Sequence, residues 1–323
     1  MGKKDPGFTA ASLKIVVTML IFGSIGLIRR NIPYSSAMIS FFRGAVAALI
    51  LFVLRLCGVF GHRASSATSA ASSESSLGSS ADAASHATSS ADYRTEVRVN
   101  LIPLAISGAM IGVNWILLFE AYRFTTIAVA TISYYMAPVF TVIASVFILK
   151  EKLTVRKAVC VLIAVIGMVF VSGVIETGIS GLKGVLLGMG AALLYSGDVI
   201  INKKVKGVDG IDRTIIQMGF AALAVLPYWL VNEDFSTLTF SLQPMMLLMV
   251  TAVVCTALTY SLYFSAIQKV PAQTAAILSY IDPVVAVLIS AFILHEGMSV
   301  LTLVGVVLVI GAALFSETGR SED

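Results

Sequence analysis

The sequence contains few charged residues, few cysteines and no recognisable catalytic arrangement. Only 12% of its 323 residues are Asp, Glu, Lys or Arg, about half the share found in soluble globular domains. Its three cysteines, Cys57, Cys160 and Cys255, are widely spaced in apolar surroundings, which argues against a disulfide framework or a metal site. A glycine-rich phosphate loop with lysine and a nucleophile–base pair are also missing. We therefore expect no cofactor, no metal and no nucleic-acid partner, and a chain that is not an enzyme.

Long apolar segments recur along the sequence. Hydrophobic residues make up 58% of the chain, and the mean hydropathy is +0.93. A helix needs about 20 apolar residues to cross the roughly 30 Å of hydrocarbon in a bilayer. The sequence therefore predicts an all-α membrane protein. Its ten predicted transmembrane helices are 12–28, 35–58, 99–121, 126–149, 155–174, 182–202, 212–231, 243–267, 272–294 and 299–316.

Lysine and arginine fall mainly on one side of these predicted spans. Seventeen of them lie on the side of the N-terminus and four on the other side. Because cytoplasmic loops are enriched in positive charge, the tails 1–11 and 317–323 are expected in the cytoplasm, and the protein in the cytoplasmic (inner) membrane. Residues 64–92 are mostly Ser, Ala and Thr, a composition that predicts a disordered cytoplasmic loop.

A 35-residue segment occurs twice. Residues 121–155 return as residues 266–300, at a fixed offset of 145. Each copy is an apolar helix with an aromatic–x–x–Pro interruption, closed by a charged turn. The pairs include Tyr135/Tyr280, Pro138/Pro283 and Glu151/Glu296. Because the first half (12–174) contains five predicted helices, an odd number, the second half (182–316) should enter the membrane from the opposite side. Inverted repeats are typical of secondary transporters; a duplication kept only for folding is the alternative.

Two charged residues lie deep inside predicted spans. Arg43 should lie roughly 12 Å below the outer surface and Asp282 about 15 Å into its helix. A charge at such depth is costly unless it faces a cavity or a partner. Arg43 is predicted to capture an anionic group or to form a structural ion pair. Asp282 could carry a coupling proton, bind a cationic group or pair with Arg43, and the adjacent Pro283, like Pro138 in the first repeat, is predicted to kink its helix.

Polar aromatic residues gather in four of the predicted helices. Buried Tyr and Trp need partners for their polar atoms, so these side chains are predicted either to line one central site or to pack. The set is Trp115, Tyr134, Tyr135, Tyr260, Tyr263 and Tyr280, with Asn114 beside it.

Other charged and small residues are expected to have structural roles. Asp198 is predicted to reach the membrane interface, with a functional role as the alternative, and Glu120 to pair with Arg123 three residues later. Glu151 and Glu296 are predicted to cap helix ends or to contact the interface. The small faces Gly108/Gly112 and Gly184/Gly188 are expected to let helices approach closely.

Both copies resemble the EamA-type branch of the drug/metabolite transporter superfamily. The matching stretches are NWILLFEAYRFTTIAVATISYYMAPVFTVIASVFILKEKLT and SLYFSAIQKVPAQTAAILSYIDPVVAVLISAFILHEGMS, which share an AY or AI turn, a central Pro and an L-x-E turn. The resemblance implies two inverted five-helix repeats around a central cavity. It places Tyr135, Pro138, Tyr280, Asp282 and Pro283 near that cavity. Asp282 stands where family members often carry Glu before Pro, and its mate is Ala137, so no symmetric carboxylate mechanism is implied.

The expected function is secondary transport by alternating access, and the resemblance implies that the substrates are small organic metabolites, amino-acid-like or drug-like, moved in the direction of export. The expected partners are a small-molecule substrate and the lipid bilayer, and a homodimer is left open. Two other classes remain as alternatives, a non-transporting membrane scaffold or sensor and a membrane enzyme acting on lipid. The enzyme would need ionisable residues clustered at one interface, and the sequence has no such cluster.

Overall fold

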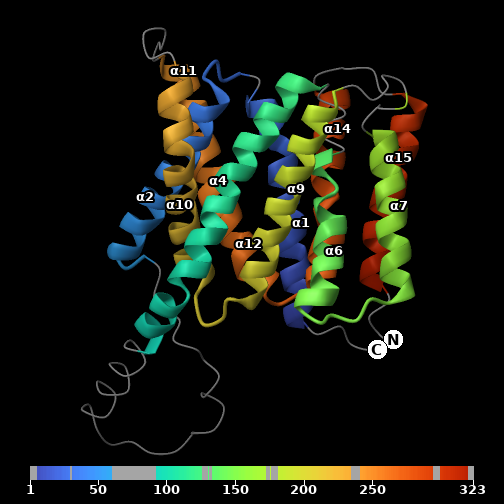
Figure 1. Cartoon of the computed structure of the whole chain (residues 1–323), viewed down its shortest axis with the longest axis horizontal. Coiled ribbons are helices and arrows are strands. Elements are labelled where there is room, and N and C mark those ends of the chain that lie inside the picture. The colour runs from blue at the N-terminus through green and yellow to red at the C-terminus, as the bar shows by residue number, and fades with distance from the viewer. Residues whose placement is uncertain are drawn as a thin grey trace, which may run out of the picture.

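The described chain is a bundle of helices lying side by side (Figure 1). The computed structural model describes residues 6–29, 31–59, 92–125, 130, 133–171, 175, 181–233, 241–293 and 299–318, and these contain no strand. Six helices in this part are long and apolar enough to cross a membrane, and shorter apolar helices accompany them. The prediction of an all-α membrane architecture is confirmed at this level.

The described helices overlap the predicted ranges. The first half contains α1 (Pro6–Arg29), α2 (Ser36–Leu56), a short helix at 92–99, α4 (Leu101–Phe124), α6 (Ala137–Ile148) and α7 (Val155–Val171). The second half contains α9 (Leu182–Lys204), α10 (Gly210–Asn232), α11 (Leu242–Ala252), a π-helical turn (Val253–Leu258), α12 (Thr259–Ile267), α13 (Ala272–Ser279), α14 (Ile281–Phe292) and α15 (Val300–Thr318). Most of the predicted loop 64–92, together with 126–129 and 294–298, lies outside the described residues.

Two of the predicted spans are interrupted near their prolines. In the second half, α13 ends at Ser279 and α14 begins at Ile281, two residues before Pro283. In the first half, α6 begins at Ala137, with Pro138 in its first turn. Proline removes a backbone donor and its ring clashes with the preceding turn. Each interruption frees backbone polar groups in the middle of the bundle.

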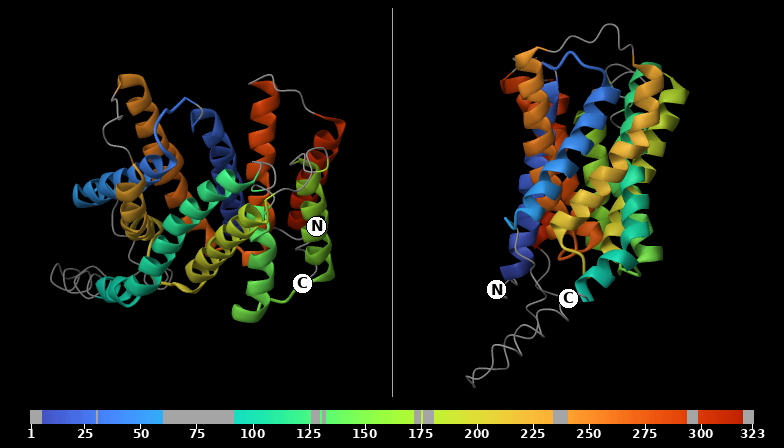
Figure 2. Two further views of the ribbon diagram at one scale, coloured as in Figure 1. Left: turned by 45° about the horizontal axis from the view of Figure 1, so that its top comes forward. Right: turned by 90° about the vertical axis from the view of Figure 1, so that its left-hand side faces the viewer.

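Contacts between the halves hold the bundle together. α4 packs on α9 and α10, α2 packs on α10 and α11, and α1 packs on α12 and α14. The pair α7 and α15 packs together at one side, as Figures 1 and 2 show. Close approach is possible at Gly108 of α4, because a Cβ there would lie 2.3 Å from the backbone oxygen of Gln217. The predicted role of the Gly108/Gly112 face is confirmed for this contact.

Polar contacts tie several helix ends together at one end of the bundle. We call the end at which α1 begins the lower end and the opposite end the upper end, as they lie in Figure 1. At the lower end Arg55 pairs with Asp212 at 2.9 Å, and Tyr93 also donates to Asp212. Burial is the main reason why the pKa of Tyr93 is raised, and the hydrogen bond to Asp212 raises it further. The contacts connect α2, the helix at 92–99 and α10.

Candidate functional site

A cavity of about 470 Å³ lies between the two halves. It extends from the middle of the bundle to the upper end, because its lining reaches Ile32 in the α1–α2 connection and Tyr122 in the last turn of α4. The volume suits a small organic molecule. The lining residues are Met19, Phe22, Gly23, Ile25, Ile32, Ile39, Arg43, Trp115, Leu118, Phe119, Tyr122, Tyr134, Tyr135, Ala137, Pro138, Tyr195, Thr251, Tyr260, Ser279, Asp282 and Ala286.

Arg43 presents a positive charge to this cavity. It is only 8% exposed, and its Nε donates to the Thr256 hydroxyl at 3.0 Å. Its guanidinium carbon lies 4.9 Å from the ring centroid of Trp115, within the range of a cation–π contact. Among the described residues this is the only hydrogen bond of the side chain, so its two terminal nitrogens are available to a bound anion.

The partner of Arg43 sits in an unusual part of the backbone. Thr256 lies in the π-helical turn Val253–Leu258 between α11 and α12. Its hydroxyl donates to the backbone oxygen of Thr251 at 2.9 Å, five residues earlier, which fits the wider turn. Such π-turns inside α-helices are frequent at functional sites. Here the turn places an acceptor directly against the arginine.

Asp282 supplies the negative charge of the cavity. It lies in the first turn of α14, and its carboxylate accepts a hydrogen bond from the Tyr135 hydroxyl at 3.2 Å. The described part of the chain contains no ion pair between Asp282 and Arg43. The ion pair between Asp282 and Arg43, one of the alternatives that the sequence left open, is therefore absent from this structure. Both charges face the cavity instead.

Aromatic rings form much of the cavity wall. Tyr134 contacts Tyr135 and Tyr195, with ring centroids 5.5 and 6.1 Å apart. Across the cavity, Phe22 and Tyr260 pack edge to face at 5.1 Å. Rings in this arrangement offer both apolar faces and hydroxyl groups to a ligand.

Four of the predicted site residues do not line the cavity. Asn114 donates to the backbone oxygen of Ala191 at 2.6 Å and joins α4 to α9. Tyr263 is outside the lining, but its hydroxyl lies 3.4 Å from that of Tyr195, which is part of the lining. Tyr280 is completely buried, and Pro283 is also outside the lining. The remaining predicted residues, Arg43, Trp115, Tyr134, Tyr135, Tyr260, Asp282 and Pro138, line it together.

The sequence prediction missed several lining residues. Tyr195 could have been found, since it corresponds to Phe22 at the start of the second half, and both line the cavity. Ser279 is the mate of Tyr134 at the offset of 145, and extending the repeat would have identified it. Thr256 had no such signal, because its role depends on the π-turn and on the approach of α2.

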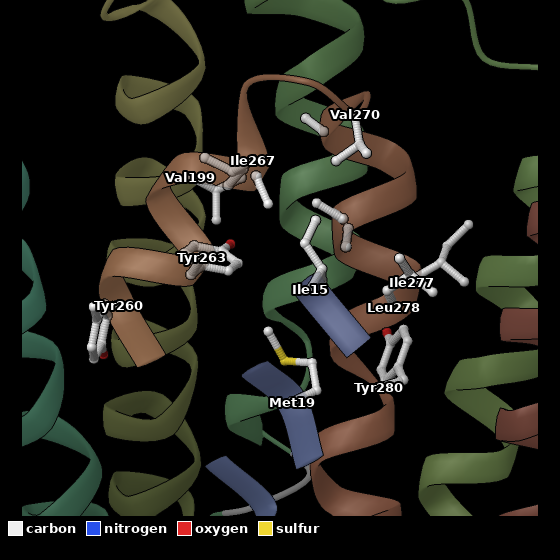
Figure 3. Close-up of a cluster of buried hydrophobic side chains, with 14 of the residues drawn as sticks. Ile15, Met19, Val199, Tyr260, Tyr263, Ile267, Val270, Ile277, Leu278 and Tyr280 are labelled. Carbon is white, nitrogen blue, oxygen red and sulfur yellow. The ribbon is translucent and has the colours of Figure 1, made fainter. Parts of the chain in front are cut away.

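Between the cavity and the lower end of the bundle, buried side chains fill the interior. Figure 3 shows Ile15 and Met19 of α1 lying between α12 and α13, which contribute Tyr263, Ile267 and Ile277. Ile15 and Ile277 are fully buried. Met19 also lines the cavity and forms part of its floor. The ligand-accessible space therefore opens toward the upper end.

A glutamate from the first half closes the lower end. Glu151, in the connection between α6 and α7, accepts hydrogen bonds from the backbone N–H groups of Ala272 and Gln273, at 2.8 and 3.3 Å. These are the first residues of α13, so the carboxylate caps a helix N-terminus, where negative charge is stabilising. The predicted capping role of Glu151 is confirmed. Glu296 lies outside the described residues.

The prediction for Asp198 was wrong, whereas that for Glu120 was right. Asp198 is 1% exposed and accepts hydrogen bonds from Ser107 and Asn202. It does not reach the interface, because its side chain points into the contact between α4, α9 and α10. Glu120 pairs with Arg123 at 3.0 Å, as predicted.

The fold and the cavity define a class of protein before any comparison is made. Apolar helices long enough to span a bilayer enclose a space of ligand size that bears one positive and one negative group. Such an arrangement is typical of multi-pass membrane transporters.

The comparisons identify the family. The EamA-like transporter family matches residues 9–173 and again residues 182–318, so the chain belongs to the EamA-like transporter family and is a multi-pass membrane transporter. It is 23% identical over 298 residues to the uncharacterized transporter YxxF of Bacillus subtilis (strain 168), covering 89% of this chain and 84% of that protein. It is 28% identical over 231 residues to an uncharacterized transporter of Clostridium kluyveri, covering 68% of this chain and 74% of that protein. A solved crystal structure shares the fold, with a TM-score of 0.72 at 14% identity, covering 95% of this chain and 98% of that one.

Proposed function

We propose that the protein is a secondary transporter that exports small organic metabolites, amino-acid-like or drug-like, by alternating access. In this proposal ten transmembrane helices form two inverted repeats, 12–174 and 182–316, around the cavity. The observation that carries the proposal is that equivalent residues of both repeats line one cavity. These pairs are Trp115/Tyr260, Tyr134/Ser279 and Ala137/Asp282 at the offset of 145, and Phe22/Tyr195.

The contacts between helices support the same symmetry. Exchanging the halves replaces α1, α2, α4 and α6 by α9, α10, α11–α12 and α13–α14. The contact α4–α9 then becomes α12–α1, α6–α9 becomes α14–α1, and α4–α10 becomes α11–α2, and each of these contacts is present. In Figure 1 α6 runs toward the lower end and α14 toward the upper end, as inversion requires. Inverted repeats provide the two mirrored conformations that alternating access needs.

The charge distribution supports an orientation. Lys150, Lys203 and Arg213 lie at the lower end, near the connections that close it. Placing this end in the cytoplasm agrees with the enrichment of cytoplasmic loops in positive charge, and puts both termini in the cytoplasm. The cavity then faces the outside, so the structure corresponds to an outward-open conformation.

The chemistry of the cavity favours a substrate with an anionic group. The terminal nitrogens of Arg43 can bind a carboxylate in a bidentate manner, while Asp282 can accept hydrogen bonds from an ammonium group. The rings of Trp115, Tyr134 and Tyr260 offer apolar contact to the rest of the molecule. A zwitterion with an apolar side chain satisfies all three features.

Counterflow in proteoliposomes tests the proposal. Vesicles containing the purified protein are loaded in turn with each of the twenty L-amino acids and assayed for uptake of the same radiolabelled compound. We expect exchange for at least one amino acid, and its loss in Arg43→Ala. Glu120→Gln, which alters a carboxylate at the upper end away from the cavity lining, serves as the matched control. Absence of exchange for any amino acid, together with no thermal stabilisation by a wider metabolite panel, would favour a scaffold or sensor.

A further inference from the structure

A second polar site lies outside the cavity, at the contact between the two halves. Asp198 and Asn202 of α9 meet Ser107 of α4 and Gln217 of α10, and all four residues are at most 1% exposed. The Asn202 side-chain amide donates to the Asp198 carboxylate at 2.8 Å and to the Ser107 hydroxyl at 3.2 Å, and the Gln217 side-chain amide donates to the side-chain oxygen of Asn202 at 2.8 Å. Ser107 donates to Asp198. None of the four lines the cavity.

We propose that Asp198, together with Ser107, Asn202 and Gln217, forms a proton-binding site that couples transport to a proton gradient. The proposal rests on the transport function proposed above and names the ion that drives it.

The first argument is charge. An ionised carboxylate buried in a membrane protein is unfavourable unless a cation neutralises it, and in the described part of the chain no ion pair involves Asp198. Arg213 lies nearby, but donates to the backbone oxygens of Val208, Asn202 and Val205 at 2.8, 3.0 and 2.7 Å. A bound proton neutralises Asp198 without any movement of that arginine.

The second argument is hydrogen-bond polarity. The Ser107 hydroxyl can donate to the ionised carboxylate or accept from the protonated one, so the contact survives a change of protonation. Gln217 adds a buried side-chain oxygen that has no hydrogen-bond partner in the described residues, so this group of side chains contains a spare acceptor for the additional proton. The groups on the Asp198 oxygen are N–H and O–H donors. A sodium ion, which needs several oxygen ligands, would require them to reorganise.

The third argument is position. The Ser107–Asp198 hydrogen bond joins α4 of the first half to α9 of the second, where Gly108 lets α4 press against the backbone of Gln217. A rocking motion between the halves must alter this bond. Tyr195, one helical turn from Asp198, lines the cavity, and its hydroxyl lies 3.4 Å from that of Tyr263. These two hydroxyls provide a polar route toward the cavity.

The titratable groups on the neighbouring elements are tyrosines, or charged groups that other partners hold or that lie near helix ends. On α12 these are Tyr260 and Tyr263, while α6 and α13 contribute none. Those on α10 and α4 are held elsewhere or lie at the far end. They are Asp212, which pairs with Arg55; Arg213, on backbone oxygens; Tyr228, which donates to Glu120; and Glu120, Tyr122 and Arg123 at the upper end. On α9 itself, Tyr195 faces the cavity, Lys203 binds the backbone oxygen of Ile267, and Lys183 and Lys204 lie near its two ends.

Infrared titration of the full-length protein in liposomes tests the site without a substrate. We expect the carbonyl band of protonated carboxylic acids, which grows as the pH falls, to contain a component that is lost in Asp198→Asn and retained in Asp282→Asn and Glu120→Gln. Ser107→Ala, which removes a donor to the ionised form, should move the midpoint of the band to higher pH and keeps the test valid if Asp198→Asn does not fold. A band unchanged in Asp198→Asn, or a midpoint that shifts when sodium replaces choline at constant ionic strength, would overturn the proposal.

A transport measurement adds the functional consequence. For an amino acid that exchanges in counterflow, accumulation driven by a pH gradient should fall at least tenfold in Asp198→Asn relative to exchange in the same vesicles. An equal loss of both, or a retained response to the gradient, would contradict coupling at this residue. If no compound exchanges at all, the transport proposal fails, and the infrared titration still decides whether Asp198 binds a proton.

Discussion

Tyr135 and Tyr280 are mates in the two copies of the repeated segment, but they have different environments. Tyr135 lines the cavity and donates to Asp282 at 3.2 Å. Tyr280 is 0% exposed, and its hydroxyl has no hydrogen-bond partner in the described residues. A buried hydroxyl without a partner is unfavourable. In a symmetric transporter the two residues would exchange environments when the cavity opens to the lower end, which would explain why each half keeps a tyrosine here.

The contrast extends to the two ends of the bundle. The upper end holds the cavity, whereas at the lower end Ile15, Ile267 and Ile277 fill the corresponding space and Glu151 caps α13. The difference is one of packing and capping, because the two repeats are similar in sequence. A variant at one residue of an equivalent pair can therefore show whether the two ends differ because of the conformation captured here or because the two repeats carry different residues.

The largest effect is expected for Arg43, which has no charged mate in the cavity lining. Arg43→Ala should reduce exchange of an anionic or zwitterionic substrate roughly 100-fold, because charge-assisted hydrogen bonds to the substrate are lost. Counterflow with the amino acid found in the screen measures this. Arg43→Lys keeps the charge without the bidentate geometry and should recover part of the rate. Wild-type exchange in Arg43→Ala would remove this residue from the site.

Asp282 tests the chemical asymmetry directly, because its mate is Ala137. Asp282→Asn should lower exchange about tenfold, since the carboxylate that faces the cavity loses its charge while its volume is kept. The double variant Ala137→Asp/Asp282→Ala moves the carboxylate to the equivalent position in the other copy of the repeated segment. If the cavity is chemically symmetric, it should restore part of the activity, and counterflow compares the three proteins. Full activity in Asp282→Asn would show that the substrate does not need this charge.

A smaller, conformational effect is expected at the lower end. Glu151→Gln weakens the cap on α13 because an uncharged amide replaces the carboxylate that faces two backbone donors. We expect a several-fold faster reaction of Ala276→Cys, a buried position in α13, with a polar maleimide in a Cys57→Ser background. Glu120→Gln at the upper end is the matched control and should leave this rate unchanged. An unaltered rate in Glu151→Gln would mean that the cap does not hold the lower end closed.

The sequence predicted most of the bundle but only part of the site, for identifiable reasons. Hydropathy located the helices, and the aromatic–x–x–Pro pattern marked the interruptions at Tyr280 and Met136, since both depend on local sequence. Depth in the membrane identified Arg43 and Asp282. Which residues line the cavity also depends on how each helix is rotated, so Tyr195 was missed, and the choice between lining and packing for Tyr263 could not be made from the sequence. Asp198 was misjudged because Ser107, which donates to it, comes from another helix, and the neighbouring Asn202 is itself held by Gln217 of a third helix.

The smallest effect brings the comparison back to the tyrosine pair. Tyr135→Phe removes a hydrogen bond to Asp282 and should lower the unfolding free energy of this conformation by about 1 kcal/mol, or roughly 2 °C in Tm. Tyr280→Phe removes a buried hydroxyl that has no partner in the described residues, so it should leave Tm unchanged or raise it by a similar amount. Thermal unfolding of both variants in detergent measures the two signs. Equal losses in both would mean that Tyr280 finds a partner in solution, and that the two environments differ less than this structure indicates. Opposite signs, combined with slower exchange in both variants, would mean that Tyr280 forms its contacts in the other conformation of the transport cycle.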